Sequence, residues 1–225
     1  MWESLREKIN ELIEEVGDAT LVLVTKNQPK SLMKELLEIP EVRHIGENRW
    51  QEFKKKFLHG DEHTCSSSLY EEFKEKDIEF HFIGHLQTNK VDEVVKYFDV
   101  IQSVDSLRLL KKIDQEAKEI KKIQRVLLEI NICDDPRKYG FAIEDLPEGV
   151  IYGSVYPNIH IEGFMTILKQ GLSEKEQLSY FKKLKKFSET FDLPIISMGM
   201  SSDYKIALKA GSNMVRIGSK VFKEL

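Results

Sequence analysis

The chain has 225 residues, of which 41% are hydrophobic and 32% are charged, a balance typical of a globular domain. Its 34 Lys and Arg residues against 38 Asp and Glu residues give a net charge of −4, which argues against a nucleic-acid partner. The two cysteines, Cys65 and Cys133, are far apart in the sequence, which does not indicate a disulfide framework and fits a reducing compartment. We find no signal peptide and no apolar run long enough to span a membrane, so we expect a cytoplasmic protein with no membrane partner.

Hydrophobic periodicity predicts alternating helices and strands from the first residues onward. An amphipathic helix is predicted over residues 2–16, and Gly17 is its stop signal. A buried strand follows at residues 21–25, then a helix over 31–38, a strand over 42–46 and a helix that ends near Phe57. Residues 58–68 are polar and aperiodic, which predicts a loop.

The same alternation continues through the rest of the chain. The remaining strands are predicted at residues 80–84, 100–104, 126–132, 159–167, 195–200 and 214–218. The intervening helices are predicted at 70–76, 88–97, from Ser106 through Ile113, at 143–146, 174–191, 203–210 and from Ser219 onward.

Eight strands separated mostly by helices predict an α/β fold, a single TIM-type (β/α)8 barrel over residues 1–225 with an extra N-terminal helix. A doubly wound open sheet is the alternative, because it needs the same alternation of strands and helices. No glycine fingerprint of a dinucleotide-binding fold follows the first strand, which favours the barrel.

The first strand runs directly into Lys26. A lysine near a dry interior is costly while charged, so its pKa tends to fall, and a neutral amine is what Schiff-base chemistry with an aldehyde requires. The alternative is a surface lysine that happens to follow a strand. Taken alone, residues 21–26 favour that alternative.

Two turns near the end of the chain predict an anion site. Residues 198–203 and 216–219 each join a strand to a helix, and Ser201, Gly218 and Ser219 offer hydroxyls and backbone N–H groups there. Arg216 adds a charged donor. Ordinary helix capping by the serines is the alternative for either turn alone. Since barrels commonly bind phosphate in the loops after strands seven and eight, the two turns together favour a phosphate site.

The amine and the phosphate site would share one mouth, because the first strand of a barrel neighbours the eighth. An amine that condenses with an aldehyde, next to a phosphate site, describes a site for pyridoxal 5′-phosphate (PLP). A Schiff-base aldolase acting on a phosphorylated sugar fits the same residues.

The chain resembles the pyridoxal phosphate homeostasis proteins, which are similar to the N-terminal barrel of alanine racemase. The segments that carry the resemblance are residues 21–26 (LVLVTK), 45–48 (IGEN), 81–90 (HFIGHLQTNK), 103–107 (SVDSL), 163–166 (GFMT), 197–201 (SMGMS) and 210–219 (AGSNMVRIGS). The resemblance implies a barrel that holds PLP as an internal aldimine on Lys26. It further implies that Ser201, Gly218 and Ser219 bind the phosphate, that Arg216 faces the pyridine nitrogen and that Asn48 lies beside the ring.

Arg216 suggests that turnover is low. Arginine does not give up its proton, so the pyridine nitrogen stays unprotonated and the ring is a weaker electron sink. The resemblance also implies that the second base of alanine racemase, a tyrosine from another domain, is missing. We therefore expect a monomeric PLP carrier with no catalytic residues, which takes part in PLP homeostasis and delivers PLP to apo-PLP enzymes. An active PLP-dependent racemase or lyase is the alternative.

Two histidine groups raise the question of a metal site. His81 and His85 are four residues apart across the end of a strand, too far for joint ligation, and His81 is predicted to be a packed histidine. His59, His63 and Cys65 match no common zinc spacing. The sequence predicts no metal.

Overall fold

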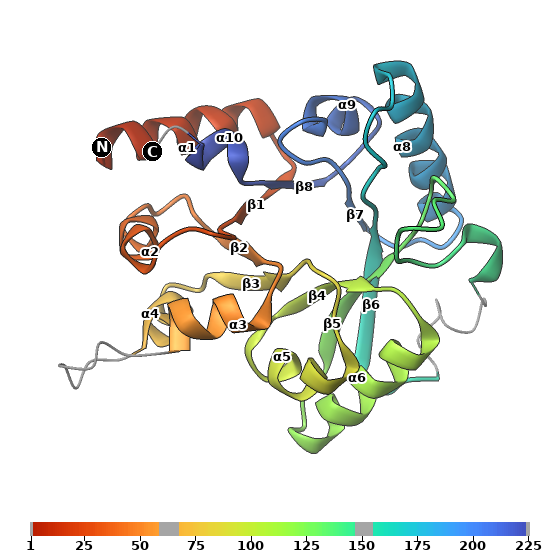
Figure 1. Cartoon of the computed structure of the whole chain (residues 1–225), viewed down its shortest axis with the longest axis horizontal. Coiled ribbons are helices and arrows are strands. Elements are labelled where there is room, and N and C mark those ends of the chain that lie inside the picture. Colours follow the sequence, from red (N-terminus) through yellow and green to blue (C-terminus); the bar gives the residue numbers. More distant parts are fainter. Residues whose placement is uncertain (1, 59–67, 147–154, 224–225) are drawn as a thin grey trace.

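A closed barrel of eight parallel strands forms the centre of the molecule in the computed structural model, which describes residues 2–58, 68–146 and 155–223 (Figure 1). Each strand pairs with the next along the chain, and the last strand closes the ring by pairing with the first. The predicted TIM-type barrel is therefore confirmed. Among the described residues, no helix has the length and apolar character needed to cross a membrane.

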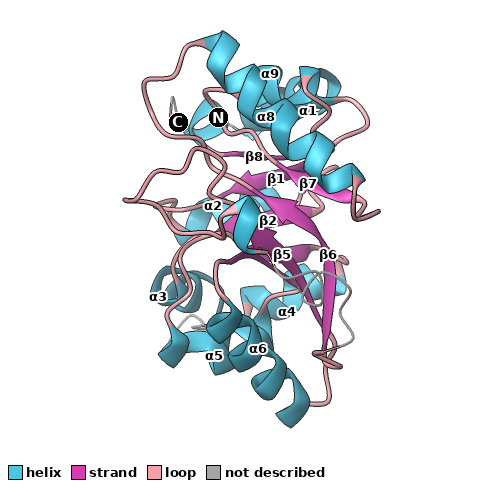
Figure 2. Ribbon diagram, turned by 90° about the vertical axis from the view of Figure 1, so that its right-hand side faces the viewer, coloured by secondary structure: helices cyan, strands magenta, loops and turns pink. Residues whose placement is uncertain are grey.

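The strands lie in the middle of the molecule and the helices surround them (Figure 2). The strands are β1 (Thr20–Val24), β2 (His44–Glu47), β3 (Glu79–Phe82), β4 (Val100–Val104), β5 (Gln124–Glu129), β6 (Ile159–Met165), β7 (Ile195–Ser197) and β8 (Met214–Ile217).

The helices follow the strands around the barrel, except for the first, which precedes β1 and is the predicted extra helix. The α-helices are α1 (Trp2–Val16), α2 (Lys30–Leu37), α3 (Trp50–Phe53), α4 (Leu69–Glu75), α5 (Val91–Tyr97), α6 (Leu107–Glu119), α8 (Glu174–Glu189), α9 (Tyr204–Lys209) and α10 (Ser219–Phe222). Lys54–Leu58 forms a π-helical segment, η1, and two 3-10 turns are η2 (Thr88–Lys90) and η3 (Ile143–Asp145). The first and last helices lie side by side (Figure 1).

Two apolar cores hold the barrel together. The inner core consists of buried side chains that point into the barrel, namely Val22, Val100, Leu127, Met165 and Met214. The outer core is larger and fills the space between the strands and the helices. In β1 the residues from Val22 to Val24 are all buried, so the strand is a nearly continuous apolar run, whereas β3 alternates polar and apolar residues.

Six strands are shorter than predicted, namely β2, β3, β5, β6, β7 and β8, and the residues beside three of them show why. Val42 donates its N–H to the carbonyl of Ile39 in a turn, so β2 begins later. Ile130 forms only an isolated bridge beyond β5. Gly199 has a φ of +99°, which ends the extended backbone after β7. Most of the predicted loop at 58–68 lies outside the described residues.

Candidate functional site

A cavity of about 510 Å³ opens at the carboxyl ends of the strands. The loops after β1, β2, β3, β5, β6, β7 and β8 contribute to its wall. All six residues that the sequence singles out for cofactor binding line it: Lys26, Asn48, Ser201, Arg216, Gly218 and Ser219. The structure therefore brings together residues that are up to about 190 positions apart in the sequence, as expected when parallel strands end at one face.

The two-residue period of the strands explains how these side chains reach the cavity. Val22 lies in the inner core, and the positions that alternate with it, Val24 and Lys26, line the cavity. In the same way, Met214 of the inner core is followed by Arg216 and then by Gly218. In β1 and β8 an apolar residue thus lies in the barrel interior and a charged residue follows on the same side at its mouth.

Lys26 is solvent-exposed and does not stand in a dry interior. It lies two residues beyond the last residue of β1, on the rim of the cavity and not within the barrel. The alternative of a surface lysine is therefore right about the exposure of its side chain. Its neighbours, however, are those of a site, because Asn48, Arg216 and Ser201 line the same cavity.

A buried ion pair holds the backbone directly before Lys26. The ammonium group of Lys56, from η1, lies against the Glu47 carboxylate and donates to the Thr25 carbonyl at 2.8 Å. The Thr25 hydroxyl also donates to the Glu47 carboxylate. Burial raises the pKa of Glu47, although the nearby Lys56 opposes this shift. These contacts fix the chain at the point where the β1 strand gives way to Lys26.

Arg216 extends its guanidinium group across the floor of the cavity and is only 3% exposed. Its Nη1 donates to the carbonyl of Ser197 at 2.9 Å, and its Nη2 donates to the carbonyl of Thr166 at 2.8 Å. Burial lowers the pKa of Arg216 to about 10, so the group is still charged at neutral pH. The cavity therefore has a fixed positive charge at its base.

The two predicted anion-binding turns meet through Ser201. The Ser201 hydroxyl accepts hydrogen bonds from the backbone N–H groups of Gly218 and Lys220, both at 3.3 Å. The residues that precede α9 and α10, Asp203 and Gly218, make no side-chain cap bond, and Ser201 instead accepts the first N–H groups of α10 from the neighbouring turn. The Ser201 oxygen thus lies where two backbone N–H groups converge, and converging N–H groups are the environment that an anion requires.

Asn48 lines the cavity and has an unpaired acceptor. Its Oδ1 atom is buried and has no hydrogen-bond partner among the described residues. The backbone of Asn48 is held closely by Gly84, where an added Cβ would lie only 2.1 Å from the Asn48 carbonyl oxygen.

Three charged residues of the cavity, Glu129, Arg137 and Lys138, were not predicted from the sequence. Burial raises the pKa of Glu129 to about 7, the nearby Asp105 adds to the shift, and Arg216 opposes it. Lys138 donates to the carbonyl of Leu168 at 2.7 Å, and burial lowers the pKa of this amine. Glu129 is the charged residue within the otherwise apolar run at 126–130, and this position could have marked it as a site residue.

An aromatic pair covers part of the cavity rim. The rings of His85 and Tyr139 stack with centroids 3.7 Å apart and planes inclined by 12°. His85 Nδ1 lies 3.1 Å from an oxygen of Asp105, which anchors the pair to the end of β4. The sequence places His85 in a loop near the site, and the structure agrees. Nothing in the sequence indicated its contact with Tyr139.

The chain matches the family described as "Alanine racemase, N-terminal domain" over residues 2–224. It is 33% identical to the pyridoxal phosphate homeostasis protein of Aquifex aeolicus, with 97% of this chain and 94% of the relative covered. It is 31% identical to the protein of the same name from Escherichia coli K12, with 97% and 92% covered.

Solved structures show the same relationship. PipY of Synechococcus elongatus, solved with PLP bound, is similar with a TM-score of 0.83 and 29% identity, covering 97% of this chain and 99% of that one. An alanine racemase from Clostridium difficile shares the fold at 17% identity and a TM-score of 0.73, covering 98% of this chain and 56% of that one. The chain belongs to the pyridoxal phosphate homeostasis protein family, whose barrel is that of the N-terminal domain of alanine racemase.

Proposed function

We propose that this protein binds PLP in the cavity at the carboxyl ends of the strands and takes part in PLP homeostasis, with Lys26 as the covalent anchor. One observation supports this most strongly. The Lys26 amine and the turns that carry Ser201 and Gly218 line a single cavity. A relative of known structure binds PLP, and its fold covers nearly the whole of this chain.

The residues of the cavity fit the cofactor in size and in chemistry. A volume of about 510 Å³ lies within the usual range for sites that bind small molecules. The N–H groups of Gly218 and Lys220, which converge on the Ser201 hydroxyl, suit the phosphate. The unpaired Oδ1 of Asn48 suits a polar group of the ring.

Arg216 is proposed to face the pyridine nitrogen and to keep turnover low. When bound, PLP supplies an aldehyde and an electron-accepting ring. A buried arginine that is charged at neutral pH donates a hydrogen bond to the ring nitrogen but does not protonate it. The ring then stabilises negative charge poorly, which supports storage and delivery more than racemisation or lyase chemistry.

Apo forms of PLP enzymes are the proposed recipients of the cofactor. The exposed position of Lys26 on the rim leaves the anchor accessible from outside the barrel, as delivery requires. We propose a monomer that acts in the cytoplasm, and the free thiol of Cys133 is consistent with a reducing compartment. Size-exclusion chromatography with light scattering tests the monomer, and a dimer would contradict it.

The visible spectrum of the purified protein tests the central proposal. We expect visible absorbance from lysine-bound PLP, its loss in Lys26→Ala and its retention in Lys55→Ala, which removes an exposed lysine outside the cavity. Unchanged absorbance in Lys26→Ala would contradict the proposal, and a colourless protein that cannot be loaded with PLP would favour the aldolase. Incubation with amino acids in deuterated water tests turnover, because rapid exchange of the α-hydrogen would identify an active enzyme.

A further inference from the structure

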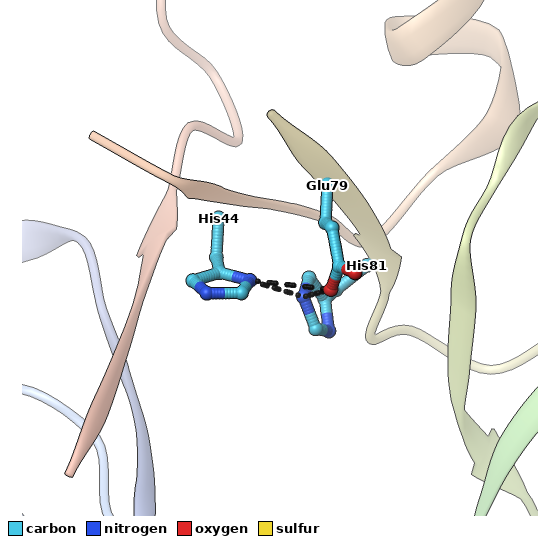
Figure 3. Close-up of side chains that lie close together, drawn as sticks. All are labelled: His44, Glu79 and His81. Carbon is cyan, nitrogen blue, oxygen red and sulfur yellow. Dashed lines mark hydrogen bonds and ion pairs between the residues drawn. The ribbon is translucent and has the colours of Figure 1, made fainter. Parts of the chain in front are cut away.

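His44, Glu79 and His81 converge at the amino-terminal end of the barrel, opposite the cavity (Figure 3). Glu79 and His81 are two residues apart on β3, so their side chains point to the same face. His44 is the first residue of β2 and lies opposite Glu79 in the parallel register. The pairing of β2 and β3 thus brings His44 next to Glu79 and His81, although these two residues follow it by 35 and 37 positions in the sequence.

The three facing atoms lie at the spacing of a metal coordination shell. His44 Nδ1 is 3.1 Å from His81 Nε2 and 3.4 Å from Glu79 Oε2, and His81 Nε2 is 3.7 Å from Glu79 Oε2. In tetrahedral zinc sites with metal–ligand bonds of 2.0–2.1 Å, neighbouring ligand atoms are about 3.3 Å apart. We propose that His44, Glu79 and His81 form a binding site for a divalent transition-metal ion of the zinc class.

The donor set selects the class of ion. Two imidazole nitrogens and one carboxylate oxygen suit Zn²⁺ or Co²⁺, whereas Ca²⁺ and Mg²⁺ prefer shells made of oxygen. The three protein ligands occupy three corners of a tetrahedron and leave the fourth corner for water or an added ligand.

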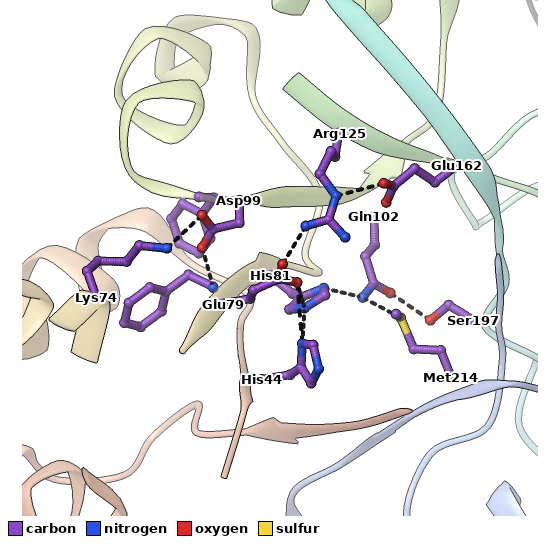
Figure 4. Close-up of polar contacts among 12 residues, drawn as sticks. His44, Lys74, Glu79, His81, Asp99, Gln102, Arg125, Glu162, Ser197 and Met214 are labelled. Carbon is purple, nitrogen blue, oxygen red and sulfur yellow. Dashed lines mark hydrogen bonds and ion pairs between the residues drawn. The ribbon is translucent and has the colours of Figure 1, made fainter. Parts of the chain in front are cut away.

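A second layer of side chains orients Glu79 toward the site (Figure 4). Arg125 Nη1 donates to Glu79 Oε1 at 2.6 Å, which leaves Oε2 directed toward the histidines. Arg125 Nε in turn donates to Glu162 at 2.7 Å. Two carboxylates around one guanidinium leave the cluster with a net negative charge, which favours a cation. Such outer contacts are typical of metal sites.

Gln102 determines which ring nitrogen of His81 has the proton. Its Nε2 faces His81 Nδ1 at 2.9 Å, while its Oε1 accepts from the Ser197 hydroxyl at 2.6 Å (Figure 4). The proton of neutral His81 therefore lies on Nε2 and points toward His44. A bound ion takes the lone pair of Nε2, so the ring has its proton on Nδ1 instead. After a half-turn of its amide group, the Oε1 atom of Gln102 can accept a hydrogen bond from this Nδ1–H group.

Solvent can reach the site from the outside of the barrel. The His44 and Glu79 side chains are 26% and 31% exposed, while His81 is completely buried behind them. An ion can therefore enter past His44 and Glu79 without opening the barrel. The site is far from Lys26 along the barrel axis, because it lies at the starts of β2 and β3 and Lys26 follows the end of β1.

Metal titration of the full-length, untagged protein after treatment with a chelator tests this site. We expect one equivalent of Co²⁺ to give the intense visible absorption of a tetrahedral complex, and Zn²⁺ to displace it. Removing a ligand by His44→Gln or Glu79→Gln should weaken Zn²⁺ binding in calorimetry by at least about 100-fold, the upper range for loss of an outer contact. Zn²⁺ should raise the melting temperature of the wild type and leave that of the variants unchanged.

Two control variants locate the ion. His160→Gln removes an exposed histidine that is not a ligand and reaches the site only through Glu162, so it should bind Zn²⁺ nearly like the wild type. A triple variant, His59→Gln, His63→Gln and Cys65→Ser, removes the other candidate ligands of the sequence and should also bind normally. The inference is overturned if the wild type binds no Co²⁺ or Zn²⁺, if His44→Gln retains the wild-type affinity, or if only the triple variant loses binding. Circular dichroism without metal verifies that each variant is folded.

Discussion

Arg216 and Ser197 are joined by two hydrogen bonds, from the Arg216 Nη1 atom to the Ser197 hydroxyl at 2.6 Å and to the Ser197 carbonyl at 2.9 Å. Ser197 is the last residue of β7 and Arg216 lies in the neighbouring strand β8. The buried guanidinium group is therefore held by the barrel itself and not by a mobile loop. Because its Nη2 atom is also bonded, to the Thr166 carbonyl, any ligand in the cavity meets a positive charge in a fixed position.

Replacing Ser197 should loosen Arg216. Ser197→Ala removes the hydroxyl acceptor from a buried charge, and hydrogen bonds to charged groups contribute about 1.5–3 kcal/mol. It also removes the hydroxyl that donates to Gln102 Oε1, which adds to the loss. We expect the free energy of unfolding to fall by about that amount in urea denaturation. Ser197→Thr keeps the hydroxyl and should lose less. If Ser197→Ala is as stable as the wild type, the Ser197 hydroxyl does not hold Arg216.

Much of the barrel could be predicted from the sequence because its determinants are local. The apolar run at 21–24 and the amphipathic pattern at 174–189 each reveal an element without reference to any other part of the chain. The order of the elements then points to the barrel and so predicts that Lys26 and Ser201 lie at one end. Strand boundaries were less predictable, because residues such as Ile130 are buried by loop packing beyond the ladder.

Contacts across the barrel could not be predicted from the sequence, because they depend on strand register. Glu47 meets Lys56, and His44 meets Glu79, only because the strands pair in one register out of several. The exposure of Lys26 depends on where β1 ends, and a difference of two residues decides whether a side chain lies inside the barrel or on its rim. Hydrophobic patterns determine neither the register of the strands nor the residue at which β1 ends.

Lys56 should be essential for stability because its charge compensates Glu47. In Lys56→Met the buried carboxylate loses its ion pair, and removing one partner of a buried pair costs about 3–5 kcal/mol. The double variant Glu47→Gln with Lys56→Met should recover part of this loss, because no uncompensated charge remains. Urea denaturation measures each change in the free energy of unfolding.

Lys55 provides the matched control for this prediction. It is adjacent to Lys56 in η1 but is exposed, so Lys55→Met should change the stability by less than about 0.5 kcal/mol. Equal effects of Lys55→Met and Lys56→Met would show that the ion pair contributes nothing specific.

Glu129 should make the cofactor-free protein less stable as the pH rises. Burial raises its pKa from 4.5 to about 7, so between these values the native state holds a proton that the unfolded state has released. Stability therefore falls from about pH 4.5 up to about pH 7, and this part of the loss is complete above that range. The total effect should be about 3 kcal/mol.

Glu129→Gln should remove this dependence, because its neutral amide does not titrate. We expect the difference in unfolding free energy between the variant and the wild type to increase from pH 5 to pH 8, in favour of the variant. Urea denaturation at four pH values gives this difference. A constant difference across the range would mean that Glu129 does not titrate there.

Tyr139 should slow the exchange of bound PLP, if PLP occupies the cavity as proposed. Its ring stacks on His85 at the rim with a centroid separation of 3.7 Å, although the side chain is 57% exposed. Aromatic stacking of this kind contributes about 0.5–1.5 kcal/mol, so Tyr139→Ala should release PLP about 2- to 10-fold faster to an excess of scavenging amine. Tyr139→Phe keeps the stacked ring and should release PLP at the wild-type rate. Equal rates for Tyr139→Ala and the wild type would show that the rim does not limit release, whereas a fast Tyr139→Phe would assign the effect to the hydroxyl and not to stacking.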